Sequence, residues 1–149
     1  MTTVFLFGLI GALAGLSGMI LGIINILHNR MAAVTACLEY TREPDFIEAR
    51  NIIWELSSYD AKAIDQDRVQ ANKLETVINT YNMIGLLVRH HQLPKWFFEE
   101  TSAGDTVIKF YDKLKPFIDY QRQKNELETY ANQFEYLYKL LCDKSQRIA

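Results

Sequence analysis

An uncharged apolar run near the N-terminus constrains this chain more than any other feature. The run from Val4 to Leu27 contains no Asp, Glu, Lys or Arg. An α-helix rises about 1.5 Å per residue, so a helix of this length crosses a hydrocarbon core of roughly 30 Å. The sequence therefore predicts one transmembrane helix in residues 1–30, followed by one helical domain in residues 31–149.

Glycines repeat along this run at alternating spacings of three and four residues. The run holds five of the seven glycines in the chain: Gly8, Gly11, Gly15, Gly18 and Gly22. This heptad spacing places them on one helix face, although each glycine costs roughly 1 kcal/mol of helix propensity relative to alanine. Small residues let helix backbones approach closely in lipid. We therefore predict self-association or docking to a partner helix; the alternative is a glycine-rich monomeric anchor.

Asn25 occupies the next position on this glycine face, near one boundary of the apolar run. A buried amide needs a hydrogen-bonding partner, and copies of Asn25 around an assembly axis would satisfy one another. This interpretation adds Asn25 to the predicted oligomerisation or pore residues. Alternatively, Asn25, His28 and Asn29 simply mark the membrane interface.

The flanks of the run predict an uncleaved anchor and its orientation. No basic residue precedes the run, and no small-x-small cleavage site directly follows it, so it is not typical of a secretory signal. Arg30 and Arg42 follow the run, while residues 1–3 carry no basic side chain. The domain after the run is therefore predicted to be cytoplasmic.

Composition excludes some classes of partner. A formal net charge of −2 disfavours bulk nucleic-acid binding and a polybasic lipid clamp, but it leaves room for a small anion pocket. The two cysteines, Cys37 and Cys142, form no CxxC pair or Cys/His cluster, which is typical of a reducing compartment. The predicted partners are membrane lipid, further copies of the chain and a protein.

Helical periodicity predicts an all-α fold, with a bundle of about five helices after the membrane helix. Residues 31–41 contain no glycine or proline, so the membrane helix should continue into the domain. Pro44 should open a second helix over residues 45–56 with Phe46, Ala49, Ile53 and Leu56 buried. The last helix is expected near residues 125–144.

Turn residues predict the other boundaries. After a loop at residues 57–60, one long helix should run to residues 92–94. Gly104 and Asp105 should provide a stop and the N-cap of the next helix, which Pro116 should kink.

Most aromatic residues lie at helical spacing and are expected in the core. Trp96, Phe97 and Phe98 differ because they are consecutive. Three consecutive bulky residues cannot all face one side of a helix. At least one should contact a partner, the membrane surface or a neighbouring subunit.

Catalytic motifs are absent from the sequence. His90 and His91 are adjacent, so on a helix they point about 100° apart and make poor joint metal ligands. There is no HExxH, no GxSxG, no glycine-rich phosphate loop outside the apolar run, and no arginine with a histidine four to six residues later, as HEPN-type ribonucleases need. We therefore expect no enzyme, metal site or cofactor.

Charged residues interrupt or border apolar faces at three positions, Arg50, Arg122 and Glu135. A buried ion pair among them would fix helix register. Alternatively, Arg122 or Arg89 with Lys95 would line an anion pocket, or these charges lie on solvated helix faces.

A succession of short motifs covers the C-terminal two thirds of the chain. It comprises NTYNMIG at 79–85, PFI at 116–118 with Arg122, Tyr130, and FEYL at 134–137. This succession resembles the uncharacterised bacterial and phage helical family labelled domain of unknown function 4760, which is similar in having an N-terminal membrane helix. The resemblance covers roughly residues 42–141 and implies a fold but no activity. It also implies an acidic residue at the position where this chain has Asn82.

The architecture is also similar to small membrane effector and accessory proteins of bacterial antiviral systems, including the pore-forming partner of RNA-targeting CRISPR nucleases. We therefore predict a self-assembling single-pass protein of the bacterial inner (cytoplasmic) membrane, acting as a pore or membrane-perturbing effector. The alternative is a membrane-anchored scaffold or sensor that binds a protein or a small anionic ligand.

Overall fold

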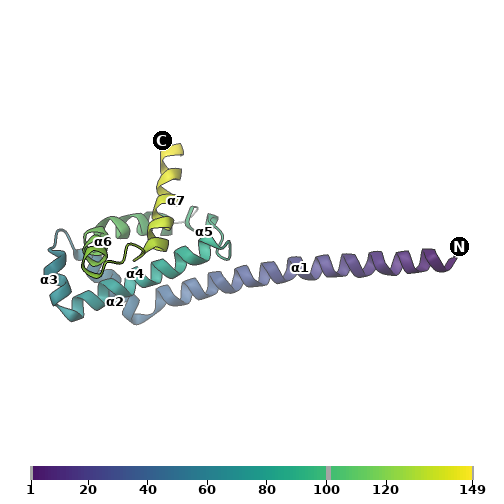
Figure 1. Cartoon of the computed structure of the whole chain (residues 1–149), viewed down its shortest axis with the longest axis horizontal. Coiled ribbons are helices and arrows are strands. Elements are labelled where there is room, and N and C mark those ends of the chain that lie inside the picture. The colour runs from purple at the N-terminus through teal and green to yellow at the C-terminus, as the bar shows by residue number, and fades with distance from the viewer. Residues whose placement is uncertain (1, 100–101, 149) are drawn as a thin grey trace.

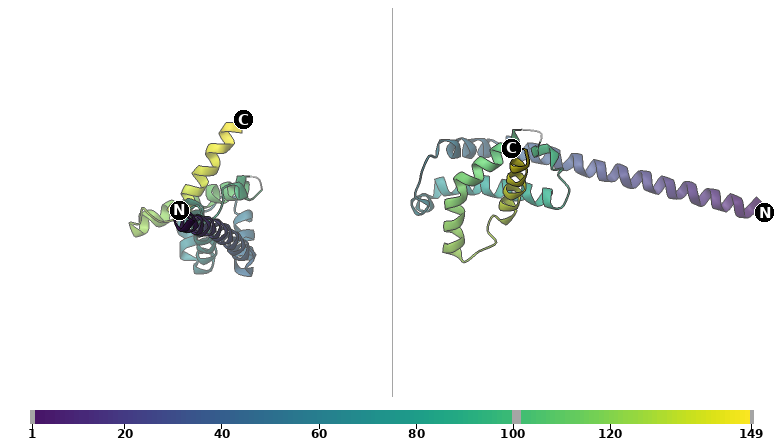
Figure 2. Two further views of the ribbon diagram at one scale, coloured as in Figure 1. Left: turned by 90° about the vertical axis from the view of Figure 1, so that its right-hand side faces the viewer. Right: turned by 90° about the horizontal axis from the view of Figure 1, so that it is seen from above.

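The computed structural model of the chain describes the backbone of residues 2–99 and 102–148, and the side chains of residues 15, 17–99 and 102–143. Within these residues the fold is all-α, as predicted. The helices are α1 (Thr2–Arg42), α2 (Pro44–Glu55), α3 (Ala61–Gln66), α4 (Arg68–Arg89), α5 (Trp96–Glu99), α6 (Ala103–Asn125) and α7 (Asn132–Ile148). Figure 1 shows α1 as a long rod that leaves a bundle made by the other helices, and Figure 2 shows the same arrangement from two further sides.

The first two helices follow the sequence prediction closely. α1 continues without interruption to Arg42, and Pro44 occupies the first turn of α2, where its missing N–H costs no hydrogen bond. Phe46, Ala49 and Ile53 are buried. Leu56 is only partly buried, because α2 ends at the residue before it.

The predicted long helix before residues 92–94 is wrong in one respect, because it is divided into α3 and α4. Asp67 lies between them with an extended backbone, and its Oδ1 accepts hydrogen bonds from the N–H groups of Val69 (3.1 Å) and Gln70 (3.3 Å). A side chain that caps a new helix in this way competes with continuation of the previous one.

The predicted boundary at Gly104 and Asp105 is also wrong. α6 begins at Ala103, so both residues lie in its first turn. A Cβ atom added to Gly104 would lie 2.5 Å from the carbonyl oxygen of Phe98. The glycine therefore permits close packing of α6 on α5 rather than ending a helix. α6 continues through Pro116 to Asn125.

The last helix starts seven residues later than the predicted position near residue 125. Glu126, with a φ of 54°, ends α6 in the left-handed conformation, and Ala131, with a φ of 59°, precedes α7. The segment between them forms a tight connection instead of helix. α6 and α7 are therefore separate helices joined at a sharp corner.

The core of the bundle is centred on α4, which packs against α2, α3, α6 and α7. The Tyr81 ring stacks on Phe134 at 5.1 Å between ring centroids. It also meets Phe46 and Phe110 edge-on, both at 5.9 Å. Since all three phenylalanines are fully buried, aromatic packing joins α2, α4, α6 and α7.

Candidate functional site

The outer part of α1 fits a membrane anchor. In the described part of the chain, one helix is long and apolar enough to cross a membrane, over Ser17–Arg42, with a mean hydropathy of 1.3. Residues 17–32 are exposed, whereas Cys37 near the base of the helix is only 2% exposed. α1 therefore combines an apolar segment that the chain itself does not cover with a base that packs on the bundle.

The described part of the glycine face is uncovered. A Cβ atom added to Gly15, Gly18 or Gly22 would meet no atom within 4 Å. Asn25 is also exposed. The surroundings of Gly8 and Gly11 lie outside the described residues. The described residues of one chain therefore make no close contact that would require a glycine at these three positions.

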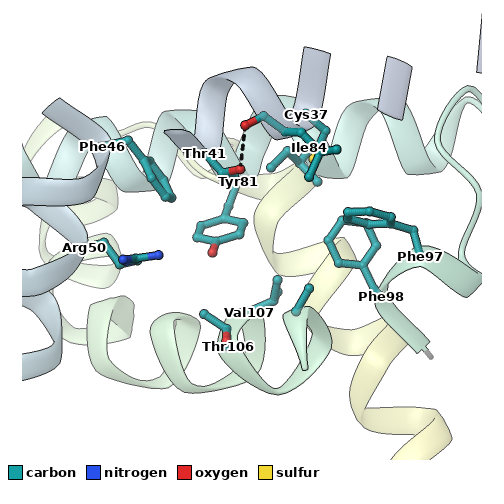
Figure 3. A pocket seen from close by; sticks show the side chains of 12 residues that line it. Cys37, Thr41, Phe46, Arg50, Tyr81, Ile84, Phe97, Phe98, Thr106 and Val107 are labelled. Carbon is teal, nitrogen blue, oxygen red and sulfur yellow. Dashed lines mark hydrogen bonds between the residues drawn. The ribbon is translucent and has the colours of Figure 1, made fainter. Parts of the chain in front are cut away.

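A pocket of about 200 Å³ lies where the base of α1 meets α2, α4, α5 and α6 (Figure 3). Most of its wall is apolar. It is lined by Cys37, Leu38, Thr41, Phe46, Arg50, Tyr81, Ile84, Phe97, Phe98, Ala103, Thr106 and Val107. A largely apolar cavity with a few convergent polar groups is the usual form of a small-molecule site.

Arg50 brings a positive charge to this pocket from α2. In Figure 3 its side chain points into the space beside Tyr81. Its Nε is buried and has no hydrogen-bond partner. A buried donor without a partner costs about 1–3 kcal/mol, so this arginine has an unmet requirement for an acceptor. Among the described residues, no Asp or Glu lines the pocket to neutralise the charge.

Tyr81 adds a second polar group, at the end of a side chain that is 5% exposed. Burial raises the pKa of Tyr81 far above its ordinary value, with Cys37 adding to the rise and Arg50 opposing it. The phenol therefore stays protonated at neutral pH and is able to donate a hydrogen bond.

The two threonines of the pocket use their hydroxyl hydrogens locally. Thr41 Oγ1 donates to the carbonyl of Leu38 at 3.1 Å, and Thr106 Oγ1 donates to the carbonyl of Ser102 at 3.0 Å. Arg50 and Tyr81 therefore remain as the strong donors with which the pocket can meet an incoming acceptor, beside the weak S–H donor of Cys37.

The other predicted charged residues lie around the start of α7. Arg122 and Glu135 are brought together in an ion pair of 2.7 Å, and Arg122 Nε donates to the carbonyl of Tyr130 at 2.9 Å. Arg89 donates to Gln133 Oε1 at 3.4 Å. These two arginines have partners within the chain, whereas the Nε of Arg50 has none among the described residues.

Asn82 also acts at the start of α7, a role that sequence reasoning missed. Its Oδ1 accepts hydrogen bonds from the backbone N–H groups of Gln133 (2.9 Å) and Phe134 (3.2 Å). One turn further along α4, a Cβ atom added to Gly85 would lie 2.0 Å from the Gln133 carbonyl oxygen. The NTYNMIG and FEYL motifs therefore meet at the crossing of α4 and α7.

This crossing shows what Asn82 does where the resemblance implies an acidic residue. A carboxylate there would accept the same two N–H groups, and a helix N-terminus also favours negative charge. Asn82 therefore keeps the capping function that an acidic residue would perform. Apart from Tyr81 and Ile84, the residues of these motifs do not line the pocket.

Comparison with known families agrees with these motifs. The family model described as Domain of unknown function (DUF4760) matches residues 2–141. This chain belongs to that family. The match extends beyond the range of about 42–141 that the motifs indicate, so α1 is part of the DUF4760 match. No curated protein and no solved structure matches the chain.

The three consecutive aromatic residues of this DUF4760 protein divide between surface and core. Trp96 is 53% exposed, Phe98 is 4% exposed, and Phe97 packs against the core and lines the pocket. They belong to α5, which lies at the end of the bundle nearer the outer part of α1 (Figure 1). The helix that carries the exposed Trp96 therefore lies at the end of the bundle from which α1 leaves.

A second contact that sequence reasoning missed closes the end of α2. Lys113 of α6 donates through Nζ to the carbonyls of Ile53 (3.1 Å), Trp54 (2.8 Å) and Leu56. A cation at the end of a helix donates hydrogen bonds to the last carbonyl groups, which have no partner within the helix. It also interacts favourably with the negative end of the helix dipole. No local signal identifies it, because Lys113 lies far along the chain from α2.

Proposed function

We propose that this DUF4760 protein is a non-enzymatic, self-assembling single-pass membrane protein whose α1 helices associate through the glycine face. The observation that supports this is the open space opposite Gly15, Gly18 and Gly22 on an exposed apolar helix. Glycine lowers helix stability by roughly 1 kcal/mol at each position, and a second helix packed against this face would offset that cost.

A ring of several α1 helices would enclose a pore, whereas a tightly packed pair leaves no lumen. Asn25 would then face the axis near one end of the span, where copies of the amide hydrogen-bond to one another. In this proposal the bundle lies on the cytoplasmic side of a bacterial inner membrane, with Trp96 at the membrane surface. Membrane perturbation in antiviral defence is the role that the architecture resembles.

The decisive experiment is the mass of the detergent-solubilised protein, measured by native mass spectrometry. We expect the wild type to form a defined assembly and the double variant Gly15→Leu/Gly18→Leu to be monomeric, because two leucines prevent close helix approach. Ser17→Leu is the control, since it also introduces a leucine into this part of α1 but lies off the glycine face. An unchanged mass for the double variant would rule out association through this face.

A second candidate function is an anchored sensor or scaffold, and the unpartnered Nε of Arg50 favours the sensor. In this class the bundle binds a small anion or a protein, and α1 serves mainly as an anchor. It predicts a monomer or dimer in detergent and no conductance in lipid bilayers. Conductance that requires an intact glycine face would instead support the pore.

A further inference from the structure

We infer that the pocket at the base of α1 binds a small amphiphilic anion, a carboxylate or phosphate group attached to a short apolar chain or ring. This inference gives the second candidate function its ligand class. It does not depend on association of α1, because every residue that lines the pocket belongs to one chain.

The charge of the pocket determines the charge of the ligand. The Arg50 guanidinium carries five N–H donors and no acceptor, so a cation or a second donor cannot satisfy it. A neutral apolar ligand would fill the space but leave the buried Nε without a partner. A carboxylate or phosphate accepts from the guanidinium in a charge-assisted hydrogen bond and from the Tyr81 hydroxyl beside it (Figure 3).

The apolar side chains of the pocket wall determine the chemistry of the uncharged part of the ligand. Ile84 on α4, Phe97 and Phe98 on α5, and Val107 on α6 offer only apolar side chains to the interior. These residues suit a hydrocarbon chain or ring, which gains from leaving water, and do not suit a sugar or nucleotide. A cavity of about 200 Å³ limits this part to a small ligand or to one segment of a longer chain.

Two sources supply this chemistry, a free amphiphilic acid in the cytoplasm or an anionic lipid of the membrane. Leu38 and Thr41 belong to the same helix as the predicted span. About ten residues, or roughly 15 Å of helix, separate the apolar run from this pocket. The two sources therefore share one site and must be separated by experiment.

The test uses the full-length protein in nanodiscs of zwitterionic phosphatidylcholine, titrated calorimetrically with octanoate and with octyl phosphate. We expect saturable binding of at least one anion and much weaker binding of octan-1-ol, which matches the chain length without the charge. Arg50→Gln should weaken anion binding about tenfold or more, because a charged hydrogen bond is lost. Arg50→Lys should recover part of it.

Arg89→Gln is the matched control, because it removes the same charge from an arginine outside the pocket and should leave the affinity unchanged. Thr106→Phe, which adds bulk to the pocket wall, should weaken binding while Arg50 remains. Circular dichroism of each variant establishes that it is folded. Failure of both anions to bind the wild type, equal binding of octan-1-ol, or unchanged binding by Arg50→Gln would overturn the inference.

Nanodiscs that contain phosphatidylglycerol separate the two sources. If membrane lipid is the ligand, octanoate binding should fall in these discs, and phosphatidylglycerol should remain bound to the wild type, but not to Arg50→Gln, in native mass spectra. If a free acid is the ligand, octanoate affinity should be equal in both kinds of disc. The mass of the assembly, measured on the same preparations, tests the proposed self-association independently.

Discussion

The glycines of the bundle and those of α1 have opposite surroundings. A Cβ atom on Gly85 would collide with Gln133, and one on Gly104 would collide with the carbonyl of Phe98, whereas Gly15, Gly18 and Gly22 have nothing within 4 Å. In the bundle, each of these glycines lets the backbone of another helix of the same chain come close. On α1, no described residue of a single copy makes such a close approach to these glycines, which is why we propose that they serve contacts between copies.

The arginines show the same contrast. Arg122 bonds to Glu135 and to the Tyr130 carbonyl, so its requirements are met by the fold. Arg50 lines a pocket with its Nε buried and unpartnered. Groups whose physical requirements are met within the chain account for the fold. The unmet requirement of Arg50 is the reason why we propose that another molecule binds beside it.

The largest expected effect distinguishes the two sets of glycines directly. Gly85→Ala should destabilise the bundle by about 3 kcal/mol or more, because its Cβ would lie 2.0 Å from a backbone oxygen of α7. Gly22→Ala should not destabilise it, since alanine favours helix and has open space there. Denaturant unfolding in detergent, followed by circular dichroism, measures both. An equal loss of stability in the two variants would refute the difference between the two sets of glycines.

A smaller effect is expected at the same crossing of α4 and α7. Asn82→Ala should cost about 1–2 kcal/mol, because the N–H groups of Gln133 and Phe134 lose their acceptor. Asn82→Asp should retain the wild-type stability, since a carboxylate accepts both bonds and suits a helix N-terminus. The same unfolding measurement compares the two variants. Loss of stability in the aspartate variant would argue against the capping role.

Acidification should weaken the bundle without affecting contacts on the glycine face. Lys139 and Arg122 lower the pKa of Glu135 below its ordinary 4.5, and Lys124 and Gln121 lower that of Asp65 below 3.8. A lowered pKa contributes stability that is complete above the ordinary value and is lost as the pH falls through the lowered one.

The urea midpoint should therefore change little above about pH 4.5 and should fall as the pH is lowered below that value. Glu135→Gln should make this fall shallower, because one of the two carboxylates no longer titrates. The assembly mass should stay constant in the range where the bundle remains folded, since no titratable residue lies on the glycine face. A mass that changes with pH in that range would contradict the separation of the two regions.

Local sequence signals were sufficient for the simplest parts of the fold. The all-α class, the continuous α1 and the start of α2 at Pro44 depend on periodicity and on the geometry of proline, which act within a few residues. The break at Asp67 was also locally readable, because aspartate before a helix is a common cap. Gly104 was misread, since its role depends on the carbonyl of Phe98 on another helix.

The sequence by itself determined an apolar helix with a glycine face and a helical domain behind it, because hydropathy and spacing are properties of neighbouring residues. Tertiary structure alone decided what the polar groups do. Asn82 meets α7 across 51 positions of the chain, and Arg50 lines a pocket to which five helices contribute. Such placements depend on how helices cross, and no short stretch of sequence specifies a crossing.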